Sequence, residues 1–294
     1  MESKFHTFAQ PIQSIPLPER FTYPFHYTPH PLCVIAAEET QAYLKERTEW
    51  REELQTGKMF GVLIVRTSNG QTGYLAAFSG NLCGSNSHSF FVPPVYDLLK
   101  PNGFFKIEEE QISAINHQIG QLQNCDRYLE LQQKMERETA SSQQALSEAR
   151  KVLKAAKEKR EQRRLHRPNE NEQVAMIRES QYQKAEFKRL ERYWKEQISE
   201  IKTELESFSS QIEALKAERR NRSAALQQKL FQQFNFLNAK GETKNLCAIF
   251  EETVQKTPPA GAGECAAPKL LQYAYLSGLS PIAMAEFWWG ESPK

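Results

Sequence analysis

The most constraining feature of this 294-residue chain is a stretch from Phe104 to Gly241 that is almost free of helix-breaking residues. Its only proline is Pro168, and its only glycine before the closing Gly241 is Gly120. The remaining positions are rich in Glu, Gln, Lys, Arg, Leu and Ala, which favour helix. A single proline near the midpoint therefore predicts two long helices that fold back on each other at residues 167–169.

Apolar residues along this stretch recur at the three- and four-residue steps that form the seam of a coiled coil. The clearest seam residues are Ile112, Ile115, Ile119 and Leu122 in the first half, and Ile198, Ile201, Leu205, Phe208, Ile212 and Leu215 in the second. An antiparallel pair would bring residues 112–122 against residues 212–226, and at 1.5 Å per residue each helix would be about 90 Å long. Between residues 136 and 149 the seam thins to Thr, Ser and Ala, which predicts the weakest section.

The segments on either side return to the composition of a globular domain. Two apolar, β-prone runs, residues 60–65 and 72–78, flank the turn residues Asn69 and Gly70. This arrangement is a strong signal for a β-hairpin. The unbroken apolar run over residues 62–65 predicts a central strand that is covered on both faces.

Further elements are expected around this hairpin. Residues 31–54 have the apolar spacing of a helix, and Pro268 opens another helix. Residues 246–250 are typical of a short strand or a helical turn, and residues 281–289 of a buried strand. The N-terminal segment, residues 1–30, is rich in proline and in the alternating aromatic residues Phe21, Tyr23, Phe25 and Tyr27, so we expect extended chain laid over a core.

These elements predict a mixed α/β (α+β) fold. A small three-strand head comprises residues 1–103 and 242–294, and an antiparallel coiled-coil arm, residues 104–241, interrupts it. The chain stops after the last strand without a terminal element, so we expect the second part of the head to be truncated.

Charge and cysteine usage restrict the setting of the protein. Residues 106–240 carry 26 Lys/Arg and 21 Asp/Glu, whereas the rest of the chain carries 12 and 15, so the arm is the basic part. No apolar run approaches the roughly 20 residues that cross a bilayer. The five cysteines are scattered and form no CxxC pair, which fits free thiols in a reducing compartment and predicts a cytoplasmic protein without a membrane partner.

The densest charge cluster lies next to the predicted fold-back. Its nine cations are Arg150, Lys151, Lys154, Lys157, Lys159, Arg160, Arg163, Arg164 and Arg167. Such a cluster neutralises phosphates and attracts nucleic acid in a salt-dependent manner. Aromatic stacking residues do not accompany it, so we expect contacts to a nucleic-acid backbone rather than base reading. The alternative is a solvated helix face without a ligand.

A second candidate is Cys265, on a loop that enters a helix after the paired strands. Zinc deaminases place a Cys or His ligand at such a point and a catalytic Glu two residues later. Ala267 occupies the Glu position here, and no Pro-Cys-x-x-Cys pair follows. We therefore predict a deaminase-like topology at most, with no catalytic residue, no cofactor and no metal site, Cys265 being the one candidate ligand. His26 and His30 are separated by Pro29, and structural roles are expected for both.

Several blocks of unusual composition run through the chain. They are Phe21-Thr-Tyr-Pro-Phe25, Pro29-His-Pro-Leu32, Gly57-Lys-Met-Phe-Gly61, Gly73-Tyr-Leu-Ala-Ala-Phe-Ser-Gly80, Phe91-Val-Pro-Pro-Val-Tyr-Asp97, Pro258-Pro-Ala-Gly-Ala-Gly-Glu-Cys-Ala-Ala-Pro-Lys269 and Ala285-Glu-Phe-Trp-Trp-Gly290. Together they resemble the long N-terminal extension of some RluA-type RNA pseudouridine synthases, and the resemblance covers nearly the whole chain.

The resemblance implies a role in RNA modification. That family isomerises uridine to pseudouridine with an aspartate in a His-Arg-Leu-Asp-type motif, in a separate domain that follows the extension. This chain contains no such motif, because Arg189-Leu190-Glu191 is not a match. The resemblance therefore implies an accessory region that positions RNA for a catalytic pseudouridine synthase domain, and uridine isomerisation is not assigned to this chain alone.

Two alternatives from other classes stay open at this stage. The arm is also consistent with a protein-interaction or scaffolding module that pairs with another helix. A metal enzyme completed by residues beyond Lys294 is the other possibility.

Overall fold

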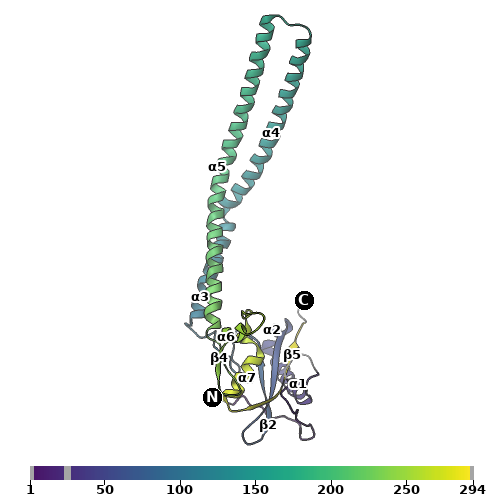
Figure 1. Cartoon of the computed structure of the whole chain (residues 1–294), viewed down its shortest axis with the longest axis vertical. Coiled ribbons are helices and arrows are strands. Elements are labelled where there is room, and N and C mark those ends of the chain that lie inside the picture. The colour runs from purple at the N-terminus through teal and green to yellow at the C-terminus, as the bar shows by residue number, and fades with distance from the viewer. Residues whose placement is uncertain (1–2, 23–27, 292–294) are drawn as a thin grey trace. The chain divides into compact units, whose positions relative to one another are not determined.

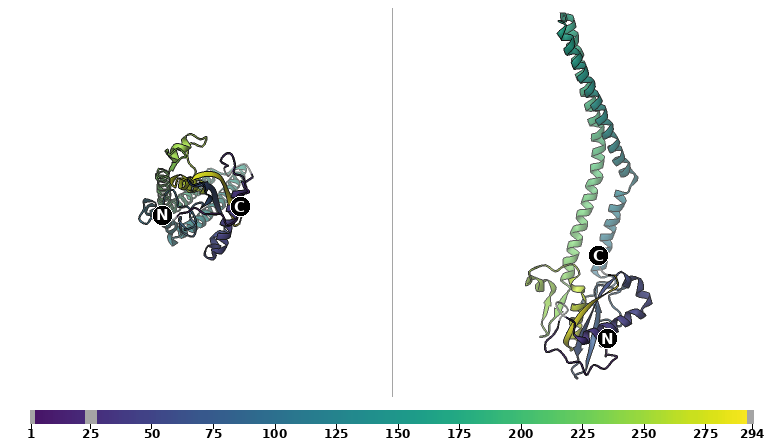
Figure 2. Two further views of the ribbon diagram at one scale, coloured as in Figure 1. Left: turned by 90° about the horizontal axis from the view of Figure 1, so that it is seen from below. Right: turned by 90° about the vertical axis from the view of Figure 1, so that its right-hand side faces the viewer.

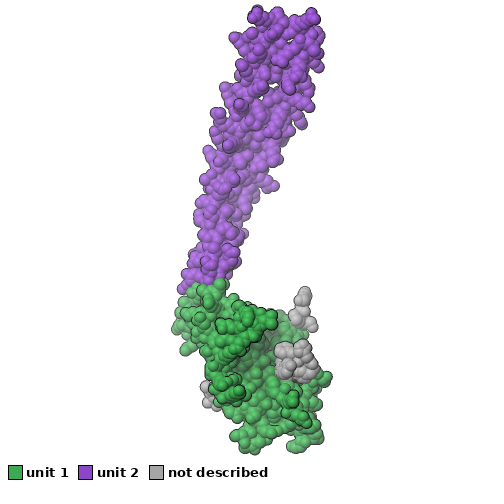
Figure 3. Space-filling view, viewed as in Figure 1, with its two compact units in different colours: residues 1–110, 223–294 green, residues 111–222 purple. Residues whose placement is uncertain are grey.

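The structure is a computed structural model that describes residues 3–22 and 28–291. It contains two compact units, shown in Figure 3: the head, residues 1–110 and 223–294, and the arm, residues 111–222. The predicted mixed α+β class is confirmed, since long helices accompany a small antiparallel sheet. The compact arm begins and ends inside the helices that form it, so its bounds are narrower than the predicted 104–241.

The sheet of the head has three antiparallel strands in the order β2-β1-β5. β1 (Lys58–Arg66) and β2 (Thr72–Phe78) form the predicted hairpin, and β5 (Ser280–Trp289) pairs with the other edge of β1. β1 is therefore the central strand, as its unbroken apolar run predicts.

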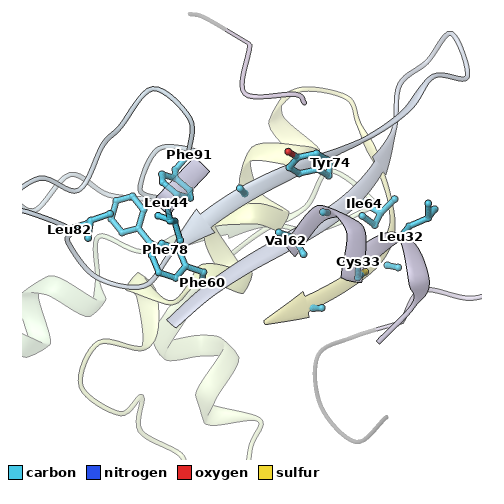
Figure 4. Packing of buried hydrophobic residues seen from close by; sticks show 14 of the residues in the cluster. Leu32, Cys33, Leu44, Phe60, Val62, Ile64, Tyr74, Phe78, Leu82 and Phe91 are labelled. Carbon is cyan, nitrogen blue, oxygen red and sulfur yellow. The ribbon is translucent and has the colours of Figure 1, made fainter. Parts of the chain in front are cut away.

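The two faces of the sheet are covered by different helices (Figure 1). Alternate side chains of β1 point to opposite faces. Phe60, Val62 and Ile64 join one fully buried cluster with α1 (Pro31–Glu46), and Figure 4 shows this packing. Leu63 and Val65 join a second cluster on the opposite face, against α7 (Ala266–Leu276). Each face thus excludes water independently.

The N-terminal segment covers the edges of the sheet. His6 pairs with Tyr74 on β2 through two backbone hydrogen bonds of 2.9 Å, and Thr22 forms an isolated bridge to Ala283 on β5. These contacts satisfy backbone groups that an open sheet edge exposes. The predictions for Tyr23, Phe25, His26 and Tyr27 concern residues outside the described ranges.

The prediction of one continuous helix over residues 31–54 is wrong. α1 ends at Glu46, and a 3-10 turn (Thr48–Trp50) and α2 (Arg51–Gln55) follow. Arg47 breaks the helix with φ −88° and ψ 80°. This change of direction allows Trp50 to reach the core cluster, where it is 8% exposed, while the Arg47 guanidinium lies 4.4 Å from the centre of the Tyr43 ring.

The helical stretch ends earlier than predicted, and a third apolar cluster of the head forms around its end. The returning helix ends at Phe231 rather than near Gly241. The chain then forms the small sheet of β3 (Asn235–Leu237) and β4 (Thr243–Asn245), followed by α6 (Leu246–Glu251). The apolar core of this part comprises Leu98, Leu230, Phe231, Phe234 and Leu246. Short strands without alternating hydrophobicity carry no pattern from which to predict them.

The helical hairpin consists of three helices instead of the two predicted. α3 (Phe104–Gln123) is separated from α4 (Asp126–Leu165), and α5 (Glu170–Phe231) is continuous. The right-hand view of Figure 2 shows the change of direction between α3 and α4. Asn124 donates from its side-chain amide to the Gly120 carbonyl at 2.8 Å, and Cys125 adopts an extended conformation. Such side chain to backbone bonds compete with helix continuation.

The predicted antiparallel seam is confirmed in its best-patterned section. Ile115, Ile119 and Ile212 are at most 7% exposed and pack together, with Leu122 and Leu215 beside them. Toward the other end the interior changes character, because the only buried residues of α4 are Leu131, Ser142 and Arg160. Two of these three side chains are polar.

Candidate nucleic-acid interface

A capped turn joins α4 to α5 at the predicted fold-back. Arg167 has a left-handed φ of 53°, and Pro168 follows it. The Asn169 side chain accepts a hydrogen bond from the Glu172 backbone N–H at 2.9 Å, and the Glu172 carboxylate accepts one from the Asn169 backbone N–H at 2.8 Å. This reciprocal pair is a capping box, which satisfies amide groups that the start of a helix leaves unpaired.

The net positive charge of the hairpin lies at the end that contains this turn. Residues 150–190 carry 13 Lys/Arg and six Asp/Glu, a net charge of +7. The remaining helical residues, 104–149 and 191–231, carry 12 and 15, a net charge of −3. We call residues 150–190 the basic tip. Its neighbours in the hairpin would repel a polyanion, so electrostatic attraction is directed to the tip.

Eight of the nine predicted cations are exposed at the basic tip. Among the described residues, three of them lie 3.7–3.9 Å from a carboxylate: Arg150 from Glu191, Lys157 from Glu161 and Arg163 from Glu179. Exposed ion pairs of this length contribute little free energy, so a phosphate can replace the carboxylate. The other five have no acidic partner within 4.0 Å in the described part of the chain: Lys151, Lys154, Lys159, Arg164 and Arg167.

Arg160 was predicted as a surface cation but is buried. It is 7% exposed, and its guanidinium donates to the Gln183 side-chain oxygen at 2.6 Å and lies 3.6 Å from Glu179. It therefore joins α4 to α5 inside the hairpin and offers no surface to a ligand. Positions equally distant from Pro168 face each other in an antiparallel pair. That symmetry points to the neighbourhood of Met176, so it does not identify Glu179 or Gln183 as the partners.

The exposed cations are distributed over more than one side of α4. At 3.6 residues per turn, Arg150, Lys154, Lys157 and Arg164 fall within about 80° of one another, whereas Lys159 points to the opposite flank. A pocket of about 480 Å³ lies beside the turn, and Arg163, His166 and Arg167 contribute to its lining. This arrangement suits several phosphates along a nucleic-acid backbone better than one small anion.

The second sequence candidate, Cys265, lies in the head and is exposed. Although the residue as a whole is exposed, partial desolvation of its sulfur and the nearby Glu286 carboxylate raise the pKa of the thiol, which disfavours the nucleophilic thiolate. Among residues 3–22 and 28–291, no three His, Cys, Asp or Glu side chains gather in a way that could hold a metal ion. The structure therefore offers Cys265 no co-ligands in these ranges.

Sequence reasoning overlooked the neighbouring Lys269. This side chain is only 2% exposed, and its amine donates to the carbonyls of Phe78 and Gly80, both at 2.9 Å. Burial lowers the pKa of the amine to about 8, while burial raises the pKa of the nearby Glu264 carboxyl. Because the amine is enclosed and bonded to backbone, it joins α7 to the end of β2 and is not placed to meet a substrate.

No helix in the described part of the chain is long and apolar enough to cross a membrane. In comparisons with known proteins, no family model, no curated protein and no solved structure matches this chain.

Proposed function

We propose that this chain is an RNA-binding accessory region in which the basic tip contacts backbone phosphates of structured RNA. In this proposal it belongs with the N-terminal extension of RluA-type pseudouridine synthases, which its sequence blocks resemble. A separate catalytic domain would isomerise uridine, and the chain would act in the cytoplasm without a cofactor.

The observation that carries the proposal is the set of five exposed cations without acidic partners among the described residues. Unpaired, solvated cations gain more from phosphate contact than cations already held by carboxylates. Each phosphate contact releases a counterion, so the affinity for RNA falls steeply as salt increases. A protein-binding helix face would not require this charge separation along one hairpin.

The test is filter binding of the chain to a structured RNA over a salt series. One variant changes four unpaired tip cations to glutamine: Lys151, Lys154, Lys159 and Arg164. The matched control changes four exposed cations elsewhere in the arm: Lys134, Arg137, Arg192 and Lys195. We expect the tip variant to bind at least about tenfold more weakly, with a salt slope reduced by about 3, since each contact contributes about 0.9 or less.

The control variant should retain wild-type affinity and slope. A flat salt response of the wild-type chain, or equal loss in both variants, would contradict the proposal.

A second candidate function is protein interaction through the arm. Apolar side chains are exposed on the basic tip, including Leu165 at 81%, Val152 at 66% and Ile177 at 50%. Val152 and Leu165 lie about 140° apart on α4, so Leu165, the most exposed of the three, is the candidate contact rather than a shared apolar face. Sedimentation equilibrium distinguishes the two functions, because self-association that Leu165→Ser abolishes would favour this second candidate over RNA binding.

A further inference from the structure

An exposed tyrosine of α5 lies level with the cation cluster of α4. Gln183 accepts the hydrogen bond from the Arg160 guanidinium at 2.6 Å, and Tyr182 is the residue immediately before it. Residues 150–167 contain no Phe, Trp or Tyr of their own. The fold-back of the hairpin therefore brings to these cations an aromatic ring that the cluster itself lacks.

The Tyr182 ring is available to a ligand. It is 65% exposed, and among the described residues no aromatic ring or cation packs on it. The other tyrosine of α5, Tyr193, packs instead against Trp194, with ring centres 5.3 Å apart. Tyr182 thus presents a flat aromatic surface to solvent at the basic tip.

The ring shares one flank of the hairpin with cations from both helices. At about 100° per residue, Arg178 lies about 40° from Tyr182 on α5 and about 6 Å away along the helix axis. Glu179 lies about 60° from Tyr182, and Arg163 of α4 approaches it to 3.9 Å. Arg163 is therefore on the Tyr182 side of the helix pair. Lys159, one turn before Arg163, lies on the same side.

The opposite flank carries cations without an exposed ring. Arg150 lies 3.9 Å from Glu191, which is half a turn round α5 from Tyr182. Phe187, the other aromatic residue that α5 contributes to the basic tip, is partly covered, since the Arg150 guanidinium lies 5.8 Å from the centre of its ring. That flank can contact a backbone, whereas the Tyr182 flank can also contact a base.

The two carboxylates nearest the ring are already paired. Glu179 lies 3.6 Å from Arg160 and 3.9 Å from Arg163, and Glu186 bonds to Arg189 one turn away. Their negative charge is therefore balanced within the hairpin, and it does not oppose the approach of a phosphate to this flank.

We propose that an unpaired RNA base stacks on Tyr182 while its neighbouring phosphates contact Arg178 and Lys159. Neither cation has an acidic partner within 4.0 Å in the described part of the chain. This inference rests on the proposed function and names the RNA that the tip prefers, a stem with an unpaired nucleotide. A paired base is stacked inside its duplex, but an unpaired one can turn out onto an exposed ring. A protein helix could cover the ring but would leave the cations without counter-charges.

The experiment measures, by fluorescence anisotropy, binding of the full chain to two labelled RNA stems that differ by one unpaired uridine. The wild-type chain should bind the stem with the unpaired uridine about 5- to 100-fold more tightly, the contribution of one stacked base. Tyr182→Leu should abolish this preference and leave the affinity for the paired stem unchanged, because no charge is lost. Tyr182→Phe should keep most of the preference. The matched control is Tyr193→Leu, outside the basic tip, which should keep it fully.

An abasic nucleotide in place of the unpaired uridine tests the stacking contact itself. It should weaken binding by the wild-type chain as much as Tyr182→Leu does. The two changes together should cost no more than either alone, because both remove the same contact. Arg178→Gln should instead reduce the salt slope by about 0.7, the value for one contact to a single strand.

The outcomes separate this inference from the proposed function. Equal affinity of the wild-type chain for both stems would overturn the inference alone, since backbone contact requires no unpaired base. A preference that persists in Tyr182→Leu, shown to be folded by circular dichroism, would do the same. Binding of neither stem would contradict both proposals. Self-association that Tyr182→Leu abolishes without a change in RNA binding would assign the ring to a protein contact.

Discussion

The head and the arm are stabilised by different interactions. In the head, Phe60, Val62, Leu63, Ile64 and Val65 of one strand are all fully buried, and helices cover both faces of the sheet. In the arm, the 40-residue α4 buries only three side chains, of which two are polar. Burial of apolar area dominates folding energetics, so the head depends on packing, and the arm depends more on helix formation and polar contacts. An arm of this kind can carry a dense surface charge without disturbing a core.

The largest expected effect is in the head core. Phe60→Ala should lower the free energy of unfolding by about 3–5 kcal/mol, because a fully buried ring is replaced by a cavity. Urea denaturation followed by tryptophan fluorescence measures this change. Val152→Ala on the exposed arm surface is the control and should have almost no effect. Similar losses in both variants would remove the contrast between the two regions.

The next effect concerns the buried amine of Lys269. Its pKa is about 8 in the folded chain against the ordinary 10.5, so the unfolded state binds more protons between these values. Lys269 by itself should therefore raise the free energy of unfolding by about 3 kcal/mol as pH increases from 8 to 10.5, measured as the difference between the wild-type chain and Lys269→Met. Lys269→Met should abolish this rise, and Lys100→Met, at an exposed position, should keep it. An unchanged pH profile in Lys269→Met would show that the amine is not desolvated.

Arg160 tests the polar interior of the arm. Arg160→Ala should destabilise the arm by about 1–3 kcal/mol, since the Gln183 side chain and Glu179 lose their partner. Affinity for RNA per folded molecule should stay unchanged, because the guanidinium is enclosed. Thermal melting by far-UV circular dichroism and filter binding give the two readouts. A loss of RNA affinity equal to that of Arg164→Gln would show that Arg160 contacts RNA and is not enclosed.

The smallest expected effect is at the turn. Asn169→Ala removes the side chain that accepts the Glu172 amide and should cost about 1 kcal/mol. Asn169→Gly should cost only a few tenths of that amount, because glycine is tolerated at this position. Thermal melting of both variants provides the comparison. Equal losses would mean that the capping box adds nothing to the backbone turn.

The amino-acid sequence by itself determined the elements whose signals are local. A stretch with a single proline and a single internal glycine predicted the hairpin, Pro168 predicted its turn, and the apolar run of β1 predicted a strand covered on both faces. These features follow from backbone preference and periodicity, which act between residues close in sequence.

Tertiary structure decided what depends on register and long-range contact. Arg160 is buried because α5 places Gln183 opposite it. Likewise, β5 completes the sheet of the head because it pairs with β1, more than 200 residues earlier in the chain. The physical reason is the same in each case: burial and pairing are properties of the neighbour, and a residue's own type does not specify which neighbour it meets.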